Sequence, residues 1–287
     1  MASNLIRRVA FAAIAIPLLV GVVWLGEWWL IAVLMVTAAL GTGELFDLAE
    51  RTGVKPLRDL GRCIAVAVPL VMILLLKVPN RLWFADQWGY LAVLAVLVVI
   101  AAAVFTRTPE QRPLASVAVT LLAPIYTAVL PAMAFVTRHA QWGGKSWTGT
   151  ALVFFPLVVT WVGDSAAMFG GRLLGGAKLA PTISPGKTRA GGIAGVVGGT
   201  AIGAVYALLV FPRVDITLAI VPAISLALVL SVIGQIGDLA ESLLKREAGV
   251  KDLSTLIPGH GGVLDRLDSL YFAIPVAAAG YHLLGVI

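Results

Sequence analysis

The sequence contains little charge and almost no cysteine. Only 13% of its 287 residues are Asp, Glu, Lys or Arg, whereas soluble domains carry about 25%. The single cysteine, Cys63, excludes an intrachain disulfide framework and a cysteine-based zinc site. Three histidines are too few for a His-rich metal cluster. Hydrophobic residues make up 60% and mean hydropathy is +0.97, so the composition predicts an integral membrane protein. The net charge of +6 suits basic loops at a membrane surface and does not indicate nucleic-acid binding.

Apolar segments follow one another along the whole chain. A helix that spans a bilayer needs about 20 mostly apolar residues. About nine segments meet or approach that length, at 9–25, 28–48, 63–78, 88–106, 114–137, 149–171, 191–211, 216–240 and 269–286. This pattern predicts an all-α, polytopic membrane helical bundle. We divide it into residues 1–148, with about five spans, and residues 149–287, which carry two polar loops at 172–190 and 241–268.

The positions of basic residues predict the orientation of the bundle. If the N-terminus is cytoplasmic, all but five of the 21 Lys and Arg residues lie in inner loops. The exceptions are Lys77, Arg81, Arg138, Lys145 and Arg213. Inner loops of membrane proteins are enriched in Lys and Arg, so we expect the N-terminus inside and the C-terminus outside. Both polar loops then face the cytoplasm, where nucleoside triphosphates are available.

The first polar loop and the segment before it contain residues suited to phosphate. Asp164 lies within the sixth apolar segment, where a carboxylate is costly unless it is paired, hydrated or metal-bound. A structural hydrogen bond between helices is the alternative. Lys187 can serve phosphate as a point charge, with Ser184 and Thr188 as hydroxyl donors. A helix that begins near Gly191 would direct its N-terminus at the same anion. A basic loop that only sets topology is the alternative here.

The second polar loop is dense in charge beside two apolar segments, which indicates a functional site. Asp238, Ser242 and Lys245 are spaced to share one helix face. Asp265 and Asp268 share a face at the start of the ninth segment, where the helix dipole favours carboxylates. Carboxylates that face one another need a cation, and Mg²⁺ typically takes one or two of them plus substrate phosphates. The residues alone therefore predict metal-assisted anion chemistry on the cytoplasmic face.

The second polar loop also resembles the signature of a known family. The matching positions are Ser242, Lys245, Arg246, Lys251, Asp252, Ile257, Pro258, His260, Gly261, Gly262, Asp265, Arg266 and Asp268. They resemble the phosphatidate cytidylyltransferases, also called CDP-diacylglycerol synthases, over about 165–268, and the first polar loop resembles the second block of the same family. Met168, Gly176 and Ala190 depart from residues that are common in relatives.

The resemblance implies an enzyme that joins CTP and phosphatidic acid to give CDP-diacylglycerol and pyrophosphate in phospholipid biosynthesis. It also implies a multi-pass protein of the bacterial inner membrane, with the active site facing the cytoplasm, and it favours a homodimer. The expected metal is Mg²⁺, bound by Asp238 and Asp265, with a second cation left open. The expected catalytic residues are Lys187, Lys245, Arg246, Lys251, Asp252, His260, Arg266 and Asp268. The expected substrate-binding residues are Asp164, Ser184, Thr188, Ser242, Gly261 and Gly262.

Two other functions share some of these sequence features. Intramembrane Asp164 and Asp238, glycine-rich spans and Glu44 near a span end are features of an ion-coupled transporter. However, the charges gather on one side of the membrane and the hydropathy pattern shows no inverted repeat. A lipid-phosphate transferase of the CDP-alcohol type would need a D-G-x2-A-R block, which the sequence lacks.

Overall fold

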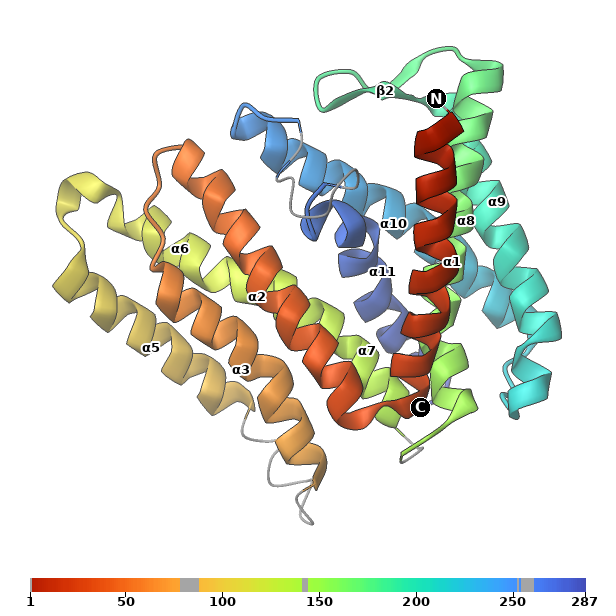
Figure 1. The fold of residues 1–287 in the computed structure, drawn as a ribbon, viewed down its shortest axis with the longest axis horizontal. Helices are drawn as coiled ribbons and strands as arrows, with labels where there is room; N and C mark the ends of the chain where they lie inside the picture. Colours follow the sequence, from red (N-terminus) through yellow and green to blue (C-terminus); the bar gives the residue numbers. More distant parts are fainter. Residues whose placement is uncertain (1, 78–87, 141–143, 252, 254–260) are drawn as a thin grey trace.

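The computed structural model describes residues 2–77, 88–140, 144–251, 253 and 261–287, with only the helical backbone described for 2–12 and 75–77. Within these residues, each of the nine predicted apolar segments contains one helical rod (Figure 1). The α-helices are α1 (Ala2–Leu25), α2 (Glu27–Arg51), α3 (Arg58–Lys77), α5 (Trp88–Thr106), α6 (Pro113–Pro124), α7 (Leu130–His139), α8 (Trp147–Leu174), α9 (Arg189–Leu209), α10 (Ile220–Glu247) and α11 (Leu264–Leu283). Short 3-10 turns lie at Pro109–Gln111 (η1) and Phe211–Val214 (η3).

The fifth rod is built from three pieces. α6 continues through a π-helical turn, η2 (Ile125–Val129), into α7. Pro131 lacks the amide that would extend a regular ladder, and a single π turn absorbs such an interruption. Within η2, the Thr127 hydroxyl lies 2.6 Å from the Thr42 hydroxyl of α2. This buried contact joins the fifth rod to the second.

Six of the helices in the described ranges are long and apolar enough to cross a membrane, by length and composition alone. They are α2, α5, the continuous α6–α7 rod, α8, α9 and α10. Large apolar side chains such as Leu94 and Phe105 of α5 point outward. The chain is therefore a multi-pass membrane protein. Its N- and C-termini lie at opposite ends of the bundle (Figure 1). The number of crossings and the end that faces the cytoplasm stay predictions.

Both polar loops are shorter than the sequence predicted. The loop predicted at 172–190 contains an antiparallel hairpin of β1 (Lys178–Ala180) and β2 (Ser184–Thr188), flanked directly by α8 and α9. The loop predicted at 241–268 is shortened from both sides, because α10 runs to Glu247 and α11 begins at Leu264. Charged residues at both ends of that loop therefore have helical positions. Hydropathy marks where apolar sequence stops, whereas helices continue past the apolar boundary.

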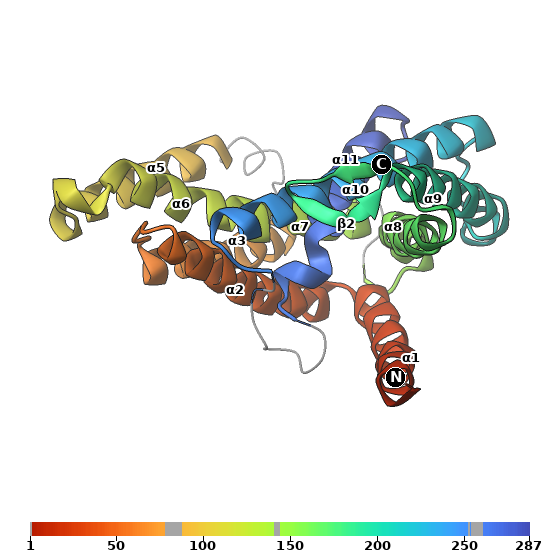
Figure 2. The same cartoon turned by 90° about the horizontal axis from the view of Figure 1, so that it is seen from above.

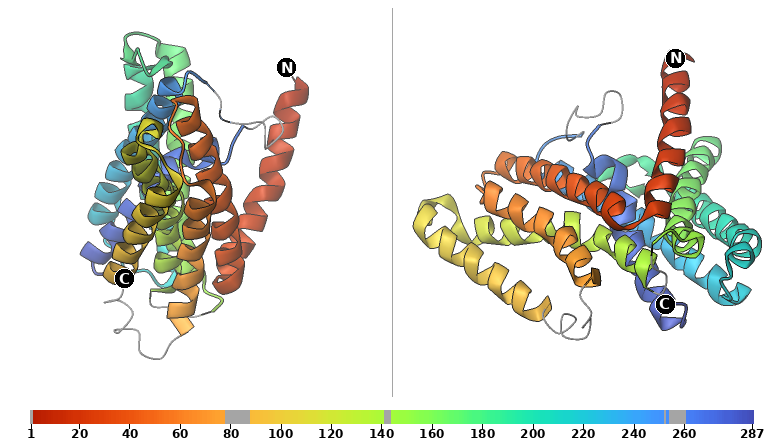
Figure 3. Two further views of the ribbon diagram at one scale, coloured as in Figure 1. Left: turned by 90° about the vertical axis from the view of Figure 1, so that its left-hand side faces the viewer. Right: turned by 60° about the horizontal axis from the view of Figure 1, so that its bottom comes forward.

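The helices form two groups (Figure 2). α8, α9, α10 and α11 pack closely on one side, and α2, α3, α5 and α6 lie on the other. α8 and α9 lie so close together that a Cβ at Gly199 would come within 3.0 Å of the Val159 carbonyl. Glycine, which has no Cβ, permits this close approach. α1 lies along the outside of the bundle and contacts α2 and α8 (Figure 3). α11 contacts α2 and α7 as well as α8 and α10, so it connects the two groups.

Candidate active site

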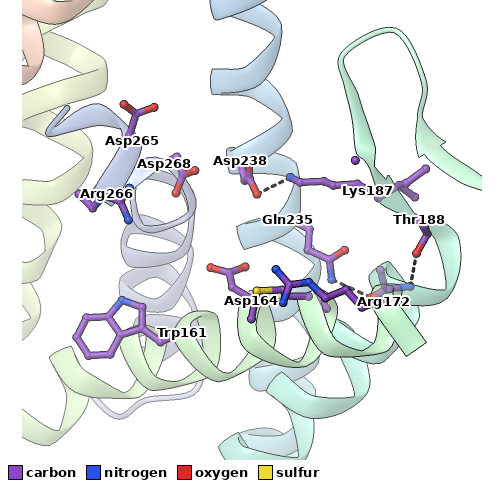
Figure 4. Close-up of a pocket in the computed structure, with 17 residues that line it drawn as sticks. Trp161, Asp164, Arg172, Lys187, Thr188, Gln235, Asp238, Asp265, Arg266 and Asp268 are labelled. Atoms are coloured by element: carbon purple, nitrogen blue, oxygen red, sulfur yellow. Dashed lines mark hydrogen bonds and ion pairs between the residues drawn. The ribbon is translucent and has the colours of Figure 1, made fainter. Parts of the chain in front are cut away.

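A cavity of about 630 Å³ lies where α8, α10, α11 and the hairpin meet (Figure 4). Four carboxylates and three cationic side chains line it, together with glycine backbone and a few apolar groups. The charged lining residues are Asp164, Arg172, Lys187, Asp238, Asp265, Arg266 and Asp268. Opposite charges thus share one open volume, which suits a ligand that carries phosphates and their counter-cation.

Three of the carboxylates come from three different helices and point toward one another. Asp164 of α8, Asp238 of α10 and Asp268 of α11 face the same space (Figure 4). Asp164 is close enough to interact electrostatically with both of the others. Lys187 of β2 forms an ion pair with Asp238, and each of these side chains is about 30% exposed. The four lining carboxylates outnumber the three lining cations by one, so the lining carries an excess of negative charge that a bound cation can offset.

The hairpin that carries Lys187 is held in place at its base and at its tip. Thr188 caps α9, and its hydroxyl accepts a hydrogen bond of 3.0 Å from the amide of Gly191. Arg246 of α10 donates to the carbonyl of Ile183 at the hairpin turn, also at 3.0 Å. These contacts connect β2 to α9 and α10. They fix the approach of Lys187 to the carboxylates.

A second ion-pair cluster lies beside the cavity. Lys245 of α10 places its ammonium 2.7 Å from Asp265 Oδ1 and 3.0 Å from Glu241 Oε1. The other oxygen of Asp265 accepts a 2.9 Å hydrogen bond from the amide of Gly262. Asp265 lies one turn away from Asp268 and points away from the three facing carboxylates (Figure 4). Both of its oxygens are engaged by protein groups.

The structure brings about half of the sequence-predicted site residues to the cavity. Those that line it are Asp164, Lys187, Thr188, Asp238, Asp265, Arg266 and Asp268. Those that do not line it are Ser184, Ser242, Lys245, Arg246, Lys251, Gly261 and Gly262. Asp252 and His260 lie outside the described residues. The chemical roles assigned to all of them stay predictions.

Two of the predicted catalytic cations contact protein groups. Lys245 is held by two carboxylates, and Arg246 donates to the carbonyls of Ile183 and Val250. Such contacts indicate that the two side chains hold neighbouring segments of the protein together. Spacing along a helix shows which residues share a face, but it does not show what the facing segment places opposite them.

Several cavity and near-cavity residues were not predicted from the sequence. Trp161, Arg172 and Gln235 line the cavity, and Gln235 donates a 3.0 Å hydrogen bond to the carbonyl of Gly192. Glu241 is 1% exposed and pairs with Lys245. Its spacing of four residues from Lys245 is a signal that could have found it. Gln235 could have been found as a polar side chain within an apolar segment.

Comparison with known proteins shows the family of the chain. Residues 6–284 match the cytidylyltransferase family. The chain belongs to this family. It is similar to phosphatidate cytidylyltransferases of three bacteria. It is 47% identical to that of Brucella suis over 139 residues, 48% of each chain. It is 39% identical to that of Haemophilus influenzae, over 66% of this chain and 63% of the relative. It is 32% identical to that of Bacillus subtilis, over 83% of this chain and 84% of the relative.

The match to the Brucella relative covers about half of that protein's length, 48%. The Bacillus match extends over most of both chains. The family match itself runs through every helix from α1 to α11. The helices that surround the cavity and those that lie away from it therefore belong to one family fold.

A magnesium site stays a prediction, and the carboxylates that line the cavity are oxygen ligands of the type that magnesium takes. Among the residues with described positions, no three His, Cys, Asp or Glu side chains form a ligand set for a metal ion. That finding disfavours a protein-only metal cage. Magnesium usually binds one or two carboxylates, several waters and substrate phosphates, and Asp238 and Asp268 can supply such a pair beside Asp164.

Proposed function

We propose that the protein transfers the cytidylyl group of CTP to phosphatidic acid, with CDP-diacylglycerol and pyrophosphate as products. The observation that supports this most strongly is the cavity, in which three facing carboxylates meet Lys187, Arg172 and Arg266 at one end of an apolar bundle. Such a site can hold two phosphate-bearing substrates and a counter-cation. Family membership and the names of the relatives support the same reaction.

The proposed step needs no dedicated general base. A phosphate oxygen of phosphatidic acid attacks the α-phosphorus of CTP and forms a new P–O bond. The bond from that phosphorus to the oxygen that bridges the β-phosphate breaks, and pyrophosphate leaves with the electron pair. The second pKa of a phosphomonoester is about 6, so the nucleophile is already largely dianionic near neutral pH. The difficulty is to bring two anions together, which positioned charges overcome.

The residues of the cavity divide this work by charge. Lys187, Arg172 and Arg266 neutralise phosphate oxygens of the two substrates. Asp238, with Asp268 and Asp164, would hold magnesium, which when bound would supply positive charge to the triphosphate and its leaving group. Asp265 was also predicted to bind metal; to do so it would exchange its present bond to Lys245. Lys187 would then leave Asp238 for phosphate as substrate and metal enter.

The lipid substrate is proposed to enter from the inner leaflet of a bacterial plasma membrane. Trp161, Met168 and Leu179 supply apolar lining to the cavity. Phe169 and Leu173 of the same helix, α8, are exposed on the bundle surface. A lipid whose acyl chains lie against α8 could then place its headgroup among the charges. The basic loops support a cytoplasmic orientation of the site, and a homodimer stays a prediction from the sequence.

The test is a purified, detergent-solubilised protein assayed with CTP and phosphatidic acid, with and without a chelator of divalent ions. The proposal expects pyrophosphate and CDP-diacylglycerol in equal amounts, with both lost on chelation and restored by Mg²⁺. Absence of both products in a folded preparation with Mg²⁺ would refute it. Ion flux in proteoliposomes without nucleotide would support the transporter alternative instead.

A further inference from the structure

The start of α11 is capped by a carboxylate from the other helix group. Glu44 of α2 accepts hydrogen bonds from two successive amides, Val263 at 3.1 Å and Leu264 at 2.9 Å. Each carboxylate oxygen serves one amide. Glu44 is only 5% exposed, so this contact is shielded from water. The two segments are more than 200 residues apart in the chain, and hydropathy patterning assigned Glu44 no part in the site.

The backbone at this point is shaped to admit the Glu44 side chain. A Cβ at Gly262 would lie 2.5 Å from Glu44 Oε1 and 2.7 Å from Oε2, so only glycine leaves room. The amide of Gly262 donates to Asp265, one turn further along α11. Three successive amides at the helix start are therefore satisfied by two carboxylates, Glu44 and Asp265. The positive end of the α11 dipole is already occupied by these protein groups.

The capped turn carries three of the charged residues that line the cavity. Asp265, Arg266 and Asp268 all lie within the first five residues of α11 and line the cavity. The direction of these side chains depends on where the first turn of α11 begins and how it is rotated. Glu44 fixes both, because its two oxygens hold two specific amides. Lys245 holds the same turn from the side of α10.

We propose that Glu44 is a positioning residue for the cavity, which sets the first turn of α11 so that Asp268 and Arg266 face the substrate phosphates. This inference rests on the proposed function for its kinetic consequence, but its structural part does not. Glu44 is not among the described residues that line the cavity. Through Glu44, the helix group that lies away from the cavity contacts the first turn of α11.

The experiment compares wild type with Glu44→Gln and Glu44→Asp. Gln keeps the size of the side chain but replaces one acceptor oxygen with an NH₂ donor, which faces an amide donor. Hydrogen exchange followed by mass spectrometry on a peptide covering 261–268 should show faster exchange at the amides of Val263 and Leu264. In the cytidylyl-transfer assay, kcat/KM should fall roughly 10–100-fold, the scale seen when groups that orient ligands are replaced. Glu44→Asp keeps both acceptor oxygens and should recover part of each loss.

The matched control is Thr42→Val, which removes the buried hydrogen bond between α2 and η2 two residues away. It should lower thermal stability while leaving exchange at 263–264, and kcat/KM per folded protein, close to wild type.

If Glu44→Gln behaved like Thr42→Val, with lower stability alone, Glu44 would be a structural anchor and the proposal would be wrong. If Glu44→Gln failed to fold, Glu44→Asp would decide: faster exchange at 263–264 with unchanged kcat/KM would overturn the proposal, and a loss in both would support it. If wild type made no CDP-diacylglycerol, the proposed function would fail, while the exchange result would still test the cap.

Discussion

Two polar clusters lie at opposite ends of the bundle and differ in what they face. At the end with the α1–α2 and α7–α8 connections, Arg138 is 0% exposed and donates to the carbonyls of Val23, Trp24 and Gly144 at 2.5–2.7 Å. Beside it, His139 accepts from the amide of Glu27 at 3.0 Å. At the end with the hairpin, the charged groups surround an open volume of about 630 Å³.

The difference shows how a membrane protein uses charge for two purposes. The Arg138 cluster is filled by backbone carbonyls at a helix end, which would otherwise lack donors away from water. It connects α1, α7 and α8. The cavity cluster leaves carboxylates facing one another with a partial set of cations, which is unfavourable without a ligand. A charge matched by backbone stabilises the fold, whereas charges that face a cavity can bind and act on a ligand.

The largest expected effect is from Asp238→Asn. The change removes a negative charge where metal and Lys187 are proposed to bind, while the neutral side chain has the same size. Activity should fall roughly 10²–10³-fold, the scale of losing one positioned electrostatic group, with thermal stability nearly unchanged. Rates of CDP-diacylglycerol formation and a melting curve in detergent check this. Near-normal turnover would break the contrast between the two clusters.

Lys187→Gln should have the next largest effect on activity. A hydrogen bond to a charged group contributes about 1.5–3 kcal/mol, so kcat/KM should fall roughly 10–100-fold. The loss is expected because a positive charge that serves phosphate is removed. Lys187→Arg retains the charge and provides the comparison, with partial activity expected. Equal kinetics for Lys187→Gln and wild type would show that the ion pair with Asp238 only holds the hairpin.

Arg138→Met should act on stability and leave chemistry unchanged. The change keeps much of the apolar stem but leaves the buried carbonyl of Val23 and the partly buried carbonyls of Trp24 and Gly144 without this donor. We expect a loss of about 1–3 kcal/mol, the cost of an unsatisfied buried polar group, seen as a lower melting temperature. KM values and kcat per folded protein should match wild type. A specific defect in kcat in the folded fraction would contradict the division drawn here.

The smallest effect is expected from Arg58→Ala. Arg58 of α3 pairs with Asp47 at 2.7 Å and Glu50 at 2.8 Å, but all three side chains are partly exposed. Exposed ion pairs contribute about 0–1 kcal/mol. Melting temperature and activity should both stay near wild type. A large loss of stability here would show that surface charge at this end supports the fold more than its exposure suggests.

Much of the helical framework was predictable because hydropathy is a local property. The helix at 88–106 was predicted at its observed bounds, and the fifth segment at 114–137 proved to be one rod of 113–139. The hairpin at 178–188 was not predicted, because its short polar strands are held by contacts to α9 and α10. Asp164, Asp238 and Asp268 were identified by residue type and spacing, but which carboxylates would face each other was not.

The amino-acid sequence by itself determined where apolar helices form, that charge gathers in two late polar regions, and which chemistry those residue types suit. The reason is that each of these depends on neighbours a few positions apart. Tertiary structure alone decided that Lys245 and Arg246 hold protein groups, and that Glu44 reaches across to cap α11. Those outcomes depend on which backbone and side-chain groups meet when distant helices pack.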